Sequence, residues 1–87
     1  MKSFTFTITD PLGIHARPAG LLVKQVAAFQ SSATIATEAK SVDARRLMAV
    51  MGLGAKTGTA VTMTFEGADE EAAATALEAF CRETLAT

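Results

Sequence analysis

The 87-residue chain contains a single cysteine, Cys81, and a single histidine, His15. One cysteine cannot form an intramolecular disulfide, and the two residues together supply too few ligands for a zinc site. The sequence therefore predicts no metal centre, and its low cysteine content is typical of a reducing compartment such as the cytoplasm. Gly52, Gly54 and Gly58 do not follow the spacing of a nucleotide-binding fingerprint, so no cofactor is expected either.

The chain also lacks a large excess of charge and a long apolar run. Eight Lys and Arg residues against nine Asp and Glu residues give a formal net charge of −1. A nucleic-acid-binding domain is usually strongly basic, and a membrane-spanning helix needs about 20 apolar residues, so neither class fits the sequence. Residues 1–7 alternate between polar and apolar side chains and do not resemble a signal peptide.

The length predicts one domain over residues 1–87 with a thin hydrophobic core. A domain of this size buries only roughly 60–65% of its unfolded surface. Such a core leaves no room for an enclosed active site. Any chemistry is therefore expected at the surface, together with a partner.

Two periodicities alternate along the chain. Apolar residues that recur at every second position predict half-buried strands, and apolar residues at helical spacing predict amphipathic helices. Turn residues separate these segments. The predicted elements are strands 2–9, 33–37, 40–43 and 60–66, and helices 16–29, 45–52 and one that begins after Asp69.

This β-α-β-β-α-β-α order predicts an α+β fold. We expect a two-layer open-faced β-sandwich, in which three helices cover one face of a four-stranded antiparallel sheet. Asp43 and Asp69 are the expected N-caps of the second and third helices, and Cys81 is expected to fill the core rather than to act in redox chemistry. The expected buried residues of the third helix are Ala73, Leu77, Phe80 and either Thr84 or Leu85.

His15 lies between a turn that contains Gly13 and the predicted start of a helix. A helix start has unpaired N–H groups and the positive end of the helix dipole, so it binds phosphate and favours a neutral imidazole. Arg17 adds a guanidinium that can neutralise phosphoryl oxygens, and Pro18 fits the first turn because it has no N–H. These residues indicate a phosphorylated histidine, although spacing alone also permits an ordinary N-cap or surface histidine.

The string Gly-Ile-His-Ala-Arg-Pro-Ala at residues 13–19 resembles the active-site signature of the HPr family, the histidine-containing phosphocarriers of the sugar phosphotransferase system. The resemblance covers essentially the whole chain, including residues 40–44, 47–54 and 67–72. In that family, the matching histidine accepts a phosphoryl group from phosphoenolpyruvate by way of enzyme I. It then passes the group to the IIA unit of a sugar permease, so the resemblance implies a carrier rather than an enzyme.

The resemblance also assigns roles to single residues. His15 matches the phosphoryl acceptor, which reacts through Nδ1, and Arg17 matches the arginine that steadies the phosphate. The N–H groups of Ala16 and Arg17 are expected to point at the phosphoryl oxygens. The first two helices form the docking surface for partners in the family, and methionine suits a surface that accepts unrelated partners. The expected contact residues are Leu12, Ala16, Gly20, Leu21, Lys24, Leu47, Met48 and Met51.

Arg46 stands where family members from low-GC Gram-positive bacteria carry a regulatory serine that a dedicated kinase phosphorylates. The resemblance therefore implies that this chain lacks the switch, and Ser41 lies in a different predicted element. Two other functions stay open: a specialised paralogue in a nitrogen-related or non-sugar phosphorelay, and a regulatory interaction module of the same fold. A carrier that visits several partners is expected to be a monomer.

The near-zero net charge is expected to average two different surfaces. Residues 1–65 contain seven basic and three acidic residues, whereas residues 66–87 contain one basic and six acidic residues. The acids collect in the last helix, which is expected on the far side of the molecule from His15. A basic rim predicts salt-sensitive docking to acidic partner proteins. The basic residues expected around His15 are Arg17, Lys24, Arg45 and Arg46.

Overall fold

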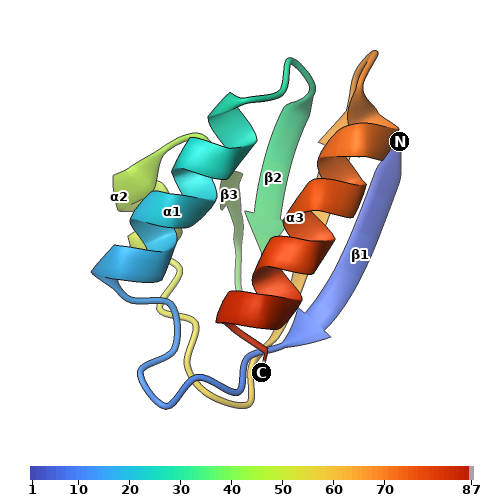
Figure 1. The fold of residues 1–87 in the computed structure, drawn as a ribbon. Helices are drawn as coiled ribbons and strands as arrows, with labels where there is room; N and C mark the ends of the chain where they lie inside the picture. Colours follow the sequence, from blue (N-terminus) through green and yellow to red (C-terminus); the bar gives the residue numbers. More distant parts are fainter. Residues whose placement is uncertain (87) are drawn as a thin grey trace.

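The computed structural model describes residues 1–86, and its elements follow the order that the sequence predicts (Figure 1). Their bounds agree with the prediction to within two residues. The strands are β1 (Lys2–Thr7), β2 (Ser32–Ala36), β3 (Ser41–Asp43) and β4 (Ala60–Glu66), and the helices are α1 (Ala16–Ala27), α2 (Leu47–Met51) and α3 (Glu70–Thr84).

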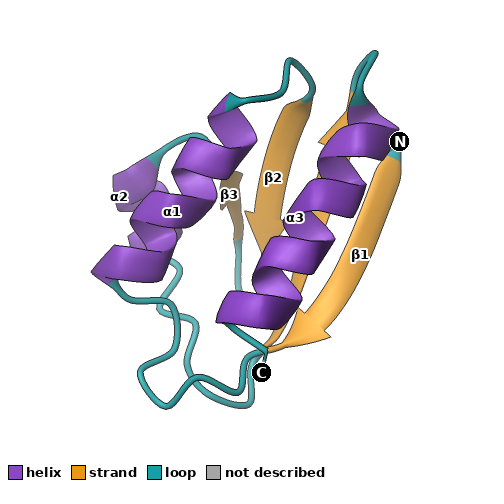
Figure 2. Ribbon diagram, in the orientation of Figure 1, coloured by secondary structure: helices purple, strands orange, loops and turns teal. Residues whose placement is uncertain are grey.

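Within residues 1–86 the strands form one four-stranded antiparallel sheet in the order β1-β4-β2-β3. Their alternating sequences separate apolar from hydroxyl side chains. Phe6 lies opposite Val61, and both side chains are buried under the helices. On the open face Thr5 lies opposite Thr62, and their hydroxyl oxygens are 2.9 Å apart. The predicted α+β fold, with helices on one face of the sheet, is confirmed (Figure 2).

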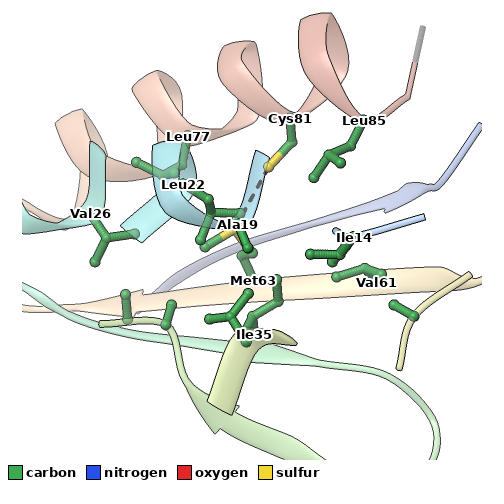
Figure 3. Packing of buried hydrophobic residues seen from close by; sticks show 14 of the residues in the cluster. Ile14, Ala19, Leu22, Val26, Ile35, Val61, Met63, Leu77, Cys81 and Leu85 are labelled. Atoms are coloured by element: carbon green, nitrogen blue, oxygen red, sulfur yellow. Dashed lines mark hydrogen bonds between the residues drawn. The ribbon is translucent and has the colours of Figure 1, made fainter. Parts of the chain in front are cut away.

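The space between helices and sheet is filled mainly by aliphatic side chains (Figure 3). α1 contributes Leu22 and Val26, and α3 contributes Leu77 and Cys81. The Cys81 sulfur lies 3.8 Å from that of Met63 on β4. Burial raises the pKa of the Cys81 thiol to about 12, so the reactive thiolate is not formed at neutral pH. The predicted role of Cys81 as apolar filler is confirmed.

The buried face of α3 differs from the prediction at one position. Ala73, Leu77 and Leu85 are buried as expected, but Phe80 is only partly buried. The i, i+4 line that starts at Ala73 runs through Leu77 to Cys81, so Cys81 takes the place in the core that the sequence suggested for Phe80.

The predicted N-caps are also partly wrong. α2 begins at Leu47 with Arg46 in the N-cap position. Asp43 instead stabilises the turn that precedes α2. Its Oδ1 accepts a hydrogen bond from the Arg45 N–H at 2.9 Å, and its carbonyl accepts one from the Arg46 N–H at 3.2 Å. Asp69 does occupy the N-cap position of α3, but its side chain makes no capping hydrogen bond.

The Asp69 carboxylate instead ties α3 to the connection between α1 and β2. Its Oδ2 accepts a hydrogen bond from the Gln30 N–H at 2.8 Å, and its Oδ1 accepts one from the N–H of buried Ser31 at 2.9 Å. The Ser31 hydroxyl donates a further, short hydrogen bond to Oδ1. This hydroxyl and the Gln30 N–H favour the ionised carboxylate and lower the pKa of Asp69.

Replacing Asp69 with Asn is expected to destabilise the fold at neutral pH and to flatten its response to acid. The folded-state pKa lies below the ordinary value of 3.8. The carboxylate therefore contributes stability that is present above that value and is lost as the pH falls through the lower, folded-state pKa. Asn cannot titrate, and its amide NH2 opposes one of the three donors. Thermal unfolding at pH 7 and at pH 2.5 measures the effect.

Glu71→Gln is the matched control, because it removes a carboxylate from the same first turn of α3 without touching Ser31. It reports the interaction of an acid with the helix dipole alone. A drop in melting temperature between pH 7 and pH 2.5 that is as large in Asp69→Asn as in the unmodified chain would contradict this account.

Candidate functional site

His15 occupies the N-cap position of α1, and its side chain does not act as a cap. The backbone is extended at this residue, with φ −109° and ψ −179°, and no capping hydrogen bond reaches the imidazole. The carbonyl of His15 accepts the first helical hydrogen bond, from the Ala19 N–H at 3.0 Å. The imidazole is 36% exposed, so it is available for chemistry at the surface.

Two loops that lie side by side hold His15 in place: residues 8–15 before α1 and residues 52–59 before β4 (Figure 1). The Ile14 N–H donates to the Ala55 carbonyl at 3.0 Å. Gly13 has φ +67°, and a Cβ there would lie 2.4 Å from the Ala55 oxygen. The close approach of the two loops therefore requires glycine at this position.

The first turn of α1 offers free donors next to the imidazole. Among the described residues, the N–H groups of Ala16 and Arg17 have no hydrogen-bond partner, and Pro18 has no N–H to satisfy. No acidic residue lies in this turn. Arg17 is exposed and, within residues 1–86, has no ion-pair partner. Two N–H groups and one free guanidinium can thus neutralise an anion bonded to the ring.

A shallow cavity of about 200 Å³ lies beside the imidazole. Sequence reasoning missed that Asp10 belongs to this site: its Oδ2 lies 3.9 Å from His15 Nε2. The turn at Pro11 and Gly13 brings Asp10 back toward the histidine, and these turn residues are the signal that could have indicated it. The residues that line the cavity are Asp10, His15, Arg17, Pro18, Leu21 and Thr84.

The predicted docking residues lie on α1, α2 and the loop before α1. Several are large apolar side chains that remain in solvent, with Leu12 72% and Met48 77% exposed, and Leu21 44% and Leu47 41% exposed. Large apolar side chains at such exposure are not part of the core. A group of them on one surface is typical of a contact site for partners. Of the other predicted contact residues, Ala16 and Lys24 are exposed, whereas Gly20 and Met51 are half-buried.

The predicted basic rim is incomplete, because Arg45 lies elsewhere. Its Nη2 donates hydrogen bonds to the carbonyls of Phe29 at 2.6 Å and Ser31 at 2.8 Å, just beyond the C-terminal end of α1. His15 lies at the opposite end of this 12-residue helix, about 18 Å away at 1.5 Å per residue. The guanidinium of Arg45 therefore binds the connection between α1 and β2 and does not face the site.

The expectation that the last helix lies far from His15 holds for only one of its ends. α3 runs antiparallel to α1 in Figure 1, with its C-terminal end beside the two loops. Glu70 and Glu71 lie in the first turn, at the remote end, whereas Thr84 in the last turn lines the cavity. Two of the four glutamates of α3 are thus remote from the cavity, whereas exposed Glu83 lies in the same last turn as Thr84.

The rest of the described chain has no candidate metal site or membrane-spanning helix, but it has another cavity. Residues 1–86 contain no group of three or more His, Cys, Asp or Glu side chains that could hold a metal ion. None of the described helices is long and apolar enough to cross a membrane. A larger cavity, of about 470 Å³, lies between the β2–β3 turn and the loop before β4, and Glu38 is its one ionisable lining residue.

Comparison with known proteins agrees with this geometry. Residues 2–83 match the family model described as the PTS HPr component phosphorylation site. The chain is 43% identical over 83 residues to the phosphocarrier protein HPr of Lysinibacillus sphaericus, covering 95% of this chain and 94% of the relative.

Solved structures show the same similarity. The histidine-containing phosphocarrier protein of Mycoplasma superimposes with a TM-score of 0.92 at 36% identity, over 95% of this chain and 94% of that one. HPr from Thermoanaerobacter tengcongensis superimposes with a TM-score of 0.91 at 36% identity, over 100% of this chain and 98% of that one. Sequence and structure together show that the chain belongs to the HPr family of non-catalytic phosphocarriers of the phosphotransferase system, whose partners are enzyme I and IIA.

Proposed function

We propose that His15 is the phosphoryl acceptor of this carrier. In this account it takes the group from phospho-enzyme I, and ultimately from phosphoenolpyruvate, and passes it to IIA units of sugar permeases. One observation carries the proposal: the imidazole is not used as a helix cap and stands beside the two unpartnered N–H groups of Ala16 and Arg17. An N-cap role for the side chain would need a hydrogen bond to the helix, which His15 does not make.

Phosphoryl transfer at this site depends mainly on the position of the imidazole and on the neutralisation of charge. The lone pair of Nδ1 forms the bond to phosphorus, and the bond to the donor breaks with its electron pair left on the donor. The N–H groups of Ala16 and Arg17 are then placed to donate hydrogen bonds to the phosphoryl oxygens at the positive end of the α1 dipole. Because the imidazole is exposed, the resulting N–P bond stays open to attack by the next partner.

Arg17 supplies the side-chain charge of the proposed site. It is in the first turn of α1, lines the cavity beside His15 and has no ion-pair partner in residues 1–86. A guanidinium that is free in the resting state can turn to the phosphoryl group without breaking another contact. We therefore assign to Arg17 the neutralisation of phosphoryl oxygens during transfer.

The docking surface is proposed to be the exposed apolar side chains around this turn. Leu12, Leu21, Leu47 and Met48 protrude from α1, α2 and the preceding loop. Burying them against enzyme I or IIA removes apolar area from water, and the flexible Met48 side chain adapts to different partners. A monomeric protein in the cytoplasm fits a carrier that exposes one such face to successive partners.

The regulatory serine is proposed to be absent from this chain. Arg46 occupies the N-cap position of the short helix α2 and is exposed. A guanidinium cannot form the phosphate ester that a serine kinase makes, and its charge is opposite to that of phosphoserine. Ser41 lies on β3, a separate element, and is not a substitute.

His15→Ala is expected to abolish phosphorylation by enzyme I with phosphoenolpyruvate. The unmodified chain gains one phosphoryl group that is labile in acid and stable in alkali, because a phosphoramidate has these properties. Intact-mass spectrometry before and after acid treatment measures it. An unmodified chain that stays unphosphorylated with competent enzyme I, or a His15→Ala variant that is still phosphorylated, would show that His15 is not the acceptor.

Arg17→Ala is expected to keep the fold and to slow transfer to IIA by about 10- to 100-fold, the worth of one charge-assisted hydrogen bond. Stopped-flow transfer rates measure this. Arg82→Ala is the matched control, because Arg82 lies on α3 and pairs with Glu78 of the same helix at 2.8 Å. Equal rates for Arg17→Ala and the unmodified chain remove the assigned role.

The chain is expected to resist the ATP-dependent kinase that phosphorylates HPr on serine. Incubation with the kinase and labelled ATP should leave the unmodified chain without label. The Arg46→Ser variant, which places a hydroxyl at the start of α2, should become labelled. Stoichiometric labelling of the unmodified chain would refute the prediction.

A further inference from the structure

The Asp10 carboxylate uses its two oxygens for different contacts. Oδ1 accepts a hydrogen bond from the Leu12 N–H at 2.8 Å and so closes the turn before His15. Oδ2 is left for the histidine and lies 3.9 Å from Nε2, on the side of the ring away from Nδ1. The carboxylate is 23% exposed and the imidazole 36% exposed, so the pair lies at the edge of the cavity rather than in open solvent.

The backbone of Asp10 is fixed from three directions. The Asp10 carbonyl accepts hydrogen bonds from the Thr57 hydroxyl at 2.5 Å and from the Gly13 N–H at 3.0 Å. The Asp10 N–H donates to the Leu85 carbonyl, at the end of α3, at 3.2 Å. The carboxylate is therefore held beside His15 by the loop before β4 and by α3, and not by its own turn alone.

We propose that Asp10 is a positioning residue for phosphoryl transfer, which holds the proton of His15 on Nε2 and so leaves the lone pair on Nδ1. This inference rests on the proposed function of His15. A neutral imidazole has one N–H and one lone pair, and the hydrogen bond made by one nitrogen decides which nitrogen carries the proton. A carboxylate has no proton to donate, and its negative charge 3.9 Å from Nε2 favours an N–H over a lone pair on that nitrogen.

The same contact stabilises the ring when charge develops on it. As Nδ1 forms its bond to phosphorus, the donor leaves with the electron pair of the broken bond. The Nε2 proton stays in place, and the ring becomes a phosphoimidazolium. Asp10 then faces a cation rather than a neutral ring. The separation of 3.9 Å is longer than a hydrogen bond, and catalytic contacts of this kind commonly shorten when charge appears.

Few other charges compete with Asp10 at this ring. Arg17 is the other charged residue that lines the cavity, and it lies in the helix turn whose N–H groups face the phosphoryl position. α3 contributes uncharged Thr84. The neighbouring loop contributes Lys56, whose Cα packs against Gly13. Asp10 is thus the one anionic side chain among the residues that line the cavity.

Asp10→Asn tests the proposal, because the amide oxygen can still accept the Leu12 N–H while the charge is removed. The readout is the 15N NMR spectrum of the His15 ring. In the unphosphorylated variant the fraction of the Nε2–H tautomer is expected to fall. Transfer of the phosphoryl group from the variant to IIA is expected to slow about threefold, because the ring loses the nearby negative charge.

Asp10→Ser is the second variant, because a serine hydroxyl also closes this type of turn but is too short to reach the ring. Glu38→Gln is the matched control for loss of one negative charge, since Glu38 lines the other cavity. Both Asp10 variants should change the 15N spectrum alike, and Glu38→Gln should not. A tautomer fraction and a transfer rate that stay unchanged in folded Asp10→Asn and Asp10→Ser would overturn the proposal.

The tautomer measurement needs no phosphoryl donor, so it separates this proposal from the proposed function. If His15 proves not to be the acceptor, the Nε2–H fraction still shows whether Asp10 orients the ring. If phosphorylation of His15 is normal but the ring spectra of the variants match the unmodified chain, only the role of Asp10 fails.

Discussion

The contact between Gly13 and Ala55 is the constraint on which the rest of the site depends. It brings the loop before α1 against the loop before β4, with the Ile14 N–H on the Ala55 carbonyl and no room for a Cβ at residue 13. The backbone of His15 is extended immediately after this contact, and α1 begins at once. The direction of the imidazole and of the first N–H groups is thus set by two segments that are far apart in sequence.

The fold was predictable because each element carries a clear periodicity. The alternation in β1 and β4 predicted the face that the helices cover, since a strand has only two faces, although β1 ends two residues before the predicted bound. The caps were less predictable, because Asp43 and Asp69 each had several donors within reach. The sequence places Asp69 at the start of its own helix, but its carboxylate binds Gln30 and Ser31, and no local pattern indicates contacts across 39 and 38 residues.

The site was predictable where it is contiguous in sequence and not where it is assembled by the fold. His15, Arg17 and the N–H groups between them follow from one motif and one helix start. Asp10 and Thr84 enter the same cavity only because a turn and the end of α3 bring them there. Arg45 is a residue that the sequence places at the site and the fold places elsewhere. Its position next to α2 predicted a place in the basic rim, but its guanidinium binds carbonyls beyond the C-terminal end of α1.

Pro18 gives the site a property that a more complete anion pocket would lack. A helix start normally presents several unpaired N–H groups, but Pro18 has no N–H, so the first turn of α1 offers only those of Ala16 and Arg17 among the described residues. On the function proposed above, two N–H groups add little binding energy to a phosphoryl group on His15. Little binding energy is then lost when the group passes to the next partner.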